Sequence, residues 1–224
     1  MIRRCALLAV LAAAGTLLPA GGAAPLAAQV GKLAPVDEAP RDASFLAFRR
    51  QLQEVVRRRD AEALYGMLAE NVETGFGGDG GVAAFKETWQ PENPLSNLWN
   101  TLEEVLRMGG SFQGASRFVA PYVHSRWPER LDPTLHVAVV GTNVRVRESS
   151  ELGSAVIAVL SYDLVPLARD RGGDRATQRW QVVQLGDGRR GYVARRYLRG
   201  PLDYRAVFEQ RGGRWVLAAL VAGD

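Results

Sequence analysis

The chain has 224 residues, of which 47% are hydrophobic and 23% charged, with a formal net charge of +4 and a sequence pI of about 9.6. This composition supports a hydrophobic core and excludes global disorder, and the length suits one large domain or two small ones. The basic pI does not indicate nucleic-acid binding, because two of the surplus charges, Arg3 and Arg4, lie in an N-terminal segment without acids.

Residues 1–28 have the layout of a secretory signal peptide. Arg3 and Arg4 precede an apolar stretch that is shorter than the ~20 residues a membrane span needs, and small residues lead to an expected cleavage after Ala28. A retained membrane anchor is the alternative interpretation. Cleavage lowers the net charge from +4 to +2 and removes Cys5, the only cysteine. We therefore expect an exported protein, periplasmic or extracellular, without disulfides, thiol nucleophiles or a membrane span.

Residues 29–43 hold Gly31, Pro35 and Pro40 without hydrophobic periodicity, which predicts a mobile tether. From Ser44, a plausible N-cap, apolar residues recur at spacings of three and four and predict a helix.

Asp60 is expected to cap a second helix that includes Met67 and Leu68. A glycine-rich loop at residues 75–81, a short helix through Phe85 and Trp89, and a helix after Ser96 follow. Residues 44–125 are thus predicted to form a mostly helical domain.

After about residue 112 the pattern changes to short strands. The expected strands, bounded by turn residues, are 136–140, 144–147, 156–160, 164–167, 180–185 and a strand starting at 190, with a final hairpin of 204–210 and 215–221. Strands at this spacing suggest a small barrel.

The strand region between residues 137 and 199 resembles a bacterial SH3 (SH3b) domain. The matching residues are Gly141 to Ser150 (GTNVRVRESS), Val156 to Leu160, Trp180 to Val193 (WQVVQLGDGRRGYV) and Tyr197-Leu198. Two departures are Ser150 near the family's usual proline and a longer loop at 170–178. We therefore predict an SH3b domain over residues 134–200, and the resemblance implies a non-catalytic module that binds peptidoglycan or peptides.

Five side chains of this domain are the predicted ligand contacts. Trp180, Tyr192 and Tyr197 offer flat amphipathic rings for stacking, and Arg147 and Arg195 are the predicted polar partners. The alternative is that Trp180 and Tyr192 belong to the core or rim of the barrel. The arginine pairs at 189–190 and 195–196 flank these aromatics, either as contacts to anionic peptides or wall polymers or as a solubilising surface.

The final hairpin, within residues 203–224, resembles the closing strands of cystatin-like or NTF2-like α+β domains. The segment RRDAEAL at residues 58–64 resembles their opening helices. One hypothesis is that the hairpin completes the N-terminal domain, with the SH3b domain inserted between them. The alternative is that the hairpin extends the SH3b sheet. The predicted fold class is accordingly α+β: a helical or cystatin/NTF2-like N-terminal region plus a small SH3-like barrel.

Residues typical of enzymes are sparse. His124 and His136 lack the spacing of a metal site, and the sequence contains no Gly-x-Ser-x-Gly motif, so we predict no metal, no cofactor and no enzymatic activity. The acidic pairs 70/73 and 103/104 are more typical of solvated helix faces than of a glycosidase cleft.

The leading hypothesis is therefore a non-catalytic cell-envelope module that binds peptidoglycan or an envelope peptide or protein, with no nucleic-acid partner. Two alternatives remain open. One is an envelope enzyme with a pocket in the helical region, and the other is a protein-interaction role in which the companion domain covers the SH3b groove.

Overall fold

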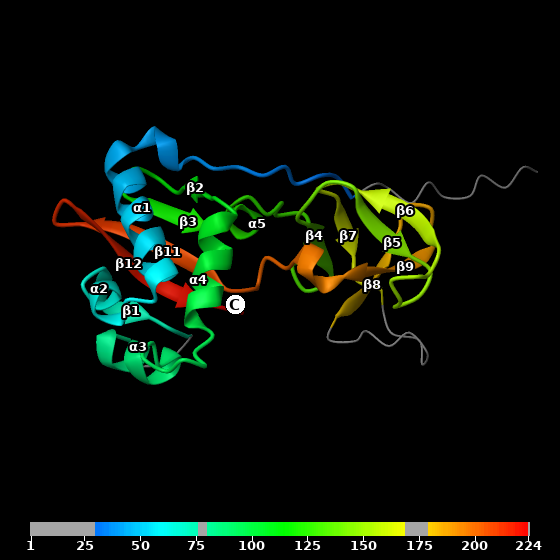
Figure 1. The fold of residues 1–224 in the computed structure, drawn as a ribbon. Coiled ribbons are helices and arrows are strands. Elements are labelled where there is room, and N and C mark those ends of the chain that lie inside the picture. The colour runs from blue at the N-terminus through cyan, green and yellow to red at the C-terminus, as the bar shows by residue number, and fades with distance from the viewer. Residues whose placement is uncertain (1–29, 76–79, 169–178, 224) are drawn as a thin grey trace, which may run out of the picture.

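A computed structural model of the chain describes residues 30–75, 80–168 and 179–223. Figure 1 shows two units: a helix-and-sheet unit, formed by residues 39–125 and 203–223, and a strand-rich unit, formed by residues 134–200. The predicted signal peptide and cleavage position lie outside the described residues. No helix in the described ranges is long and apolar enough to span a membrane.

The helices of the helix-and-sheet unit are η1 (Ala39–Arg41), α1 (Ala43–Arg58), α2 (Ala61–Tyr65), α3 (Val82–Trp89), α4 (Leu98–Arg107) and α5 (Tyr122–Ser125). Asp42, rather than Ser44, caps α1: its carboxylate accepts hydrogen bonds from the backbone N–H groups of Ser44 and Phe45. Asp60 caps α2 as expected by accepting from the N–H of Ala63.

A five-stranded sheet completes this unit, and the C-terminal hairpin supplies its centre. The strands are β1 (Leu68–Glu73), β2 (Ser111–Phe112), β3 (Arg117–Ala120), β11 (Arg205–Arg211) and β12 (Arg214–Val221), in the order β1-β12-β11-β3-β2. β11 pairs antiparallel with β3, and β12 pairs parallel with β1. This is the pairing that the insertion hypothesis requires, since the chain leaves the sheet after β3 and returns to it at β11.

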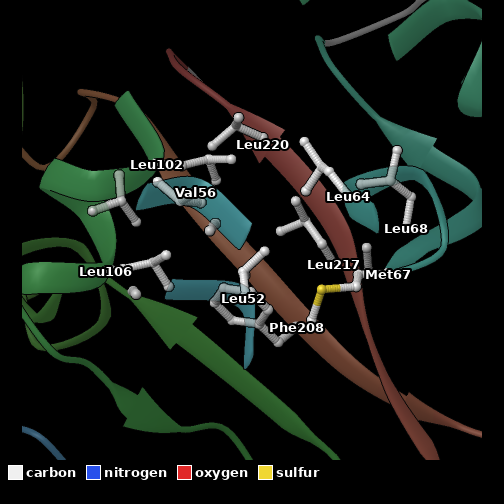
Figure 2. Close-up of a cluster of buried hydrophobic side chains, with 14 of the residues drawn as sticks. Leu52, Val56, Leu64, Met67, Leu68, Leu102, Leu106, Phe208, Leu217 and Leu220 are labelled. Carbon is white, nitrogen blue, oxygen red and sulfur yellow. The ribbon is translucent and has the colours of Figure 1, made fainter. Parts of the chain in front are cut away.

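The core of the unit lies between the helices and this sheet. Figure 2 shows Leu52 and Val56 of α1 together with Leu102 and Leu106 of α4. They face Phe208 and the strand residues Leu217 and Leu220, all in one buried cluster. The hairpin therefore contributes to the core as well as to the hydrogen bonds of the sheet.

Within residues 44–125 the sequence prediction missed strand β1, because long-range strand pairing decides the structure there. The second predicted helix ends at Tyr65 rather than at Leu68, because Leu68 begins β1 and pairs with Leu217. Apolar residues at 67 and 68 fit a helical spacing equally well, and only the distant partner strand selects the extended form.

The strand-rich unit contains two sheets. β4 (His136–Val139), β7 (Leu164–Pro166) and β10 (Leu198–Arg199) form one, in the order β10-β4-β7. β5 (Val144–Arg147), β6 (Val156–Leu160), β8 (Trp180–Gln184) and β9 (Arg190–Ala194) form the other, in the order β6-β5-β9-β8, and η2 (Arg195–Tyr197) follows β9. Within residues 136–168 and 179–199 the strands thus form two sheets rather than one closed barrel. The fold of the chain is α+β.

These two sheets nevertheless share one small core. Val139 and Val165 from the first sheet pack with Val144, Val146 and Val193 from the second. An isolated bridge between Leu167 and Val183 also connects β8 to the end of β7. The two sheets of the unit therefore share one core that is rich in valine.

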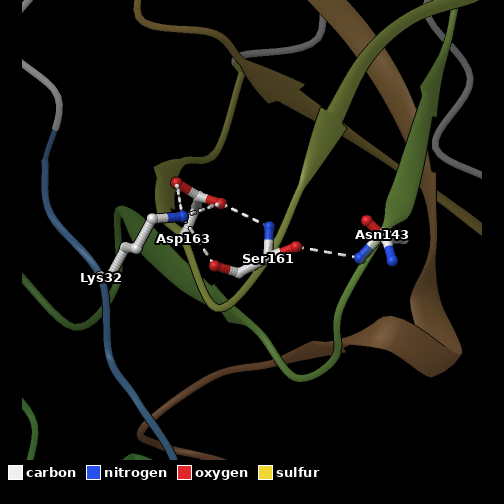
Figure 3. A network of polar contacts seen from close by, with 4 residues as sticks. All are labelled: Lys32, Asn143, Ser161 and Asp163. Carbon is white, nitrogen blue, oxygen red and sulfur yellow. Dashed lines mark hydrogen bonds and ion pairs between the residues drawn. The ribbon is translucent and has the colours of Figure 1, made fainter.

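Residues 30–38 form a strap that runs along both units, which differs from the predicted mobile tether. Lys32 forms an ion pair with Asp163 (3.0 Å) and donates to the carbonyl of Ser161, and Figure 3 shows that this network continues to Asn143. At the other unit, the carboxylate of Asp37 accepts two hydrogen bonds from Arg49. The composition of the strap alone does not predict this structure, because the residues that bind the strap lie elsewhere in the chain. Asp163 is 131 positions from Lys32, and Arg49 belongs to α1.

A buried hydrophobic cluster, to which the strap contributes Leu33, joins the two units. Leu33 of the strap packs with Met108 and Val123 of the helix-and-sheet unit and with Ala138 and Leu164 of the strand-rich unit. The β4 and β7 side of the strand-rich unit therefore faces its companion, and β5, β6 and β9 lie on the side away from it (Figure 1).

His124, half-buried at this junction, predicts a pH-dependent stability. Burial, with smaller contributions from Arg205 and Arg117, lowers the pKa of His124 below its usual 6.5, and Nδ1 donates to the carbonyl of Pro201. The unfolded chain then binds more protons than the folded one as the pH falls through 6.5, so stability decreases with falling pH. We expect the melting temperature to drop between pH 7.5 and 5.5, and to drop less in His124→Asn. An equal drop in both proteins would contradict this role.

Candidate functional site

A groove of about 300 Å³ lies on the strand-rich unit, at the low end of the volumes of ligand pockets. It is formed by the turn before β5, by β5 itself and the turn after it, by the start of β8, and by the end of β9 with η2. Its lining residues are Thr142, Asn143, Val144, Arg145, Arg147, Leu152, Trp180, Ala194, Arg196 and Tyr197. All of these lining residues belong to the strand-rich unit.

Apolar and aromatic side chains form part of the groove. Trp180 is only 8% exposed, whereas Tyr197 is 37% and Leu152 is 72% exposed. Trp180 lies directly opposite Ala194 in the β8–β9 pair, which brings two lining residues together by strand register. The groove thus combines a largely buried indole with a phenol ring and a leucine that are open to solvent, an arrangement suited to stacking and apolar contact.

Three arginines supply the charge of the groove. Arg145 and Arg147 alternate along β5 with the buried Val144 and Val146, so both arginines point to the outer face of the sheet. Arg147 donates to the carbonyl of Ser154 (2.6 Å), which holds the turn between β5 and β6. The guanidinium of Arg196 lies 4.9 Å from the ring centroid of Tyr197, a cation–π distance.

The five predicted contact residues are distributed unevenly around this groove. Trp180, Tyr197 and Arg147 line it together. Tyr192 does not line it, but it pairs with Arg147 across β5 and β9 and lies on the same face of β9 as Ala194. Arg195 is exposed at the start of η2 and also does not line the groove.

The sequence predictions name neither Arg145 nor Leu152, and they name Arg196 only as a member of the arginine pair at 195–196. The signal for Arg145 was present, because the alternation in Val144-Arg145-Val146-Arg147 places both arginines on one face. No sequence pattern indicates that Leu152 lines a groove, since it lies in a turn outside any regular alternation of apolar and polar residues.

Glu104, from the acidic pair 103/104, forms an ion pair with Arg199 (2.9 Å). In the helical region, where a pocket would support an enzyme, Trp89 and Trp99 are buried in the core. Part of the glycine-rich loop, residues 76–79, lies outside the described residues. Over residues 30–75, 80–168 and 179–223, no three His, Cys, Asp or Glu side chains are grouped as metal ligands.

Comparison with known proteins gave no match: no family model, no curated protein and no solved structure is similar to this chain.

Proposed function

We propose that the strand-rich unit is an SH3b-type domain, a variant of the small SH3-like barrel, in an exported protein of the cell envelope. The resemblance over residues 137–199 and the shared valine core of the two sheets support this assignment. The export signal is carried by residues 1–28.

We further propose that the chain is a non-catalytic module whose groove binds peptide portions of peptidoglycan. The observation that carries this proposal is the groove itself, which Trp180, Tyr197 and Arg147 line together. A stacking surface beside a fork of hydrogen-bond donors is suited to a short peptide that presents both apolar and polar groups.

A sedimentation assay with purified peptidoglycan tests this function. We expect the wild-type chain to be retained and Tyr197→Ala to weaken retention about tenfold, because exposed aromatics at the centre of a contact carry much of its binding energy. Trp180→Ala should also weaken retention. Since Trp180 is buried, that variant is informative only alongside a measured unfolding transition.

Tyr204→Ala is the matched control, because Tyr204 is also 37% exposed but lies in the helix-and-sheet unit. This variant should be retained like the wild type. Absence of wild-type retention, or equal weakening by Tyr197→Ala and Tyr204→Ala, would count against the proposed groove.

A further inference from the structure

Three arginines, Arg145, Arg147 and Arg196, line the groove. Among the described residues, no Asp or Glu lines it. Its only other polar side chains, apart from the hydroxyl of Tyr197 and the indole N–H of Trp180, are Thr142 and Asn143. The charge that the described residues bring to the groove is therefore positive.

None of these three arginines has a carboxylate partner among the described residues, whereas other arginines do. Arg49 pairs with Asp37 and Arg189 pairs with Asp187. In contrast, no ion pair connects Arg145, Arg147 or Arg196 to a carboxylate of the described residues.

Keeping these charges together is unfavourable for the unliganded protein. Arg145 and Arg147 are two residues apart on one strand face, which separates their Cα atoms by about 7 Å. Like charges on neighbouring positions repel, and a cleft lined by one sign of charge concentrates the field that attracts an oppositely charged ligand. An anion in the groove would relieve the repulsion, and the planar guanidinium fork matches a carboxylate geometrically.

The rest of the lining indicates which kind of anion fits. Leu152, Trp180 and Tyr197 offer apolar surface beside the arginines, and the volume of about 300 Å³ suits a small organic group rather than a simple ion. A peptide with a free carboxylate presents both kinds of surface at once, whereas a phosphate polymer offers little to the aromatic side.

We infer that the groove selects peptides that carry free carboxylates, with Arg145 and Arg196 as principal anion contacts and Arg147 beside them. This inference rests on the proposed function of the groove and adds its ligand chemistry. The inference predicts that the groove binds the short peptides of peptidoglycan (stem peptides) more tightly when their carboxylates are free than when those groups are carboxamides.

The test is a binding titration of residues 29–224, the chain that remains after removal of the predicted signal peptide. The probes are stem peptides released from peptidoglycan by amidase digestion, and the same peptides after carbodiimide coupling to ammonia. We expect amidation to weaken binding about tenfold, and Arg145→Gln or Arg196→Gln to weaken binding of the free-carboxylate form by a similar factor, as the loss of a charge-assisted hydrogen bond implies. Both variants should bind the amidated peptides as the wild type does.

Two further variants serve as controls. Arg145→Lys keeps the charge and should recover part of the preference for free carboxylates, and Arg50→Gln, an exposed change on α1, should change nothing. Arg145 is the cleanest site for substitution, because no hydrogen bond, ion pair or ring contact of its side chain is present among the described residues.

The remaining outcomes separate this inference from the proposed function. Equal binding of free and amidated peptides, still weakened by Tyr197→Ala, would overturn the inference and leave the groove as a peptide site. Retention on intact peptidoglycan without binding of either peptide form would also overturn it. Tighter, arginine-dependent binding of sodium polyphosphate would reassign the groove to phosphate. Absence of binding to both peptides and intact peptidoglycan would remove the proposed function and the inference together.

Discussion

A chain that ends at Gly200 is expected to lose the fold of the helix-and-sheet unit, although the truncation removes none of its helices. β11 and β12 are central strands of the five-stranded sheet, and they carry Phe208, Leu217 and Leu220, which are fully buried. Truncation of one such side chain typically costs about 2–5 kcal/mol, so loss of all three exceeds the stability of an ordinary domain of about 5–15 kcal/mol once the lost strand pairing is added.

Circular dichroism and thermal unfolding would measure this loss. We expect the truncated chain to show reduced helicity and no cooperative transition for the helix-and-sheet unit. A chain that lacks only residues 222–224, which follow β12, is the control and should unfold cooperatively. Wild-type helicity in the chain ending at Gly200 would show that the hairpin is dispensable to the unit.

Gly191→Ala is expected to destabilise the strand-rich unit by about 3 kcal/mol, the upper part of the range for overpacked cores. A Cβ atom at position 191 would collide with Cγ1 of Val146 and would lie 3.0 Å from the backbone oxygen of Arg147. Gly191 is buried on β9, which lies between β5 and β8, so the added methyl group has no free space and must displace the side chains of Val146 and Ile157.

Chemical denaturation of the purified variant would measure this change, and Gly153→Ala is its control. Gly153 lies in the same unit, in the turn before β6, and a Cβ atom there would meet no atom within 4 Å. The control should keep wild-type stability. Equal stability of Gly191→Ala and the control would contradict the close approach of β5 and β9.

The sequence predicts correctly those elements whose secondary structure follows from their own pattern of apolar and polar residues. β5 and β6 have the predicted bounds, because strict alternation in one and a short β-branched run in the other leave few alternatives. α2 was predicted too long, since Leu68 finds its partner Leu217 only in the folded chain. The strap at residues 30–38 was missed for the same reason: Lys32 is held by Asp163, 131 positions away.

The groove was predictable in part. The resemblance to SH3b domains named Trp180, Tyr197 and Arg147, which the fold brings together around one cavity. It also named Arg195, although the neighbouring Arg196 is the residue that lines the groove. Side chains on a short 3-10 turn have no simple alternation, so the sequence pattern could not distinguish position 195 from position 196.

The central claim is that peptidoglycan peptides bind in this groove, and an NMR titration tests it most directly. The ¹⁵N-labelled chain without residues 1–28 would be titrated with stem peptides released from peptidoglycan. We predict saturable amide shifts concentrated at residues 142–147, 152, 180 and 194–197, with residues 44–125 unaffected. Absence of shifts at millimolar peptide, or shifts confined to residues 44–125, would contradict the account.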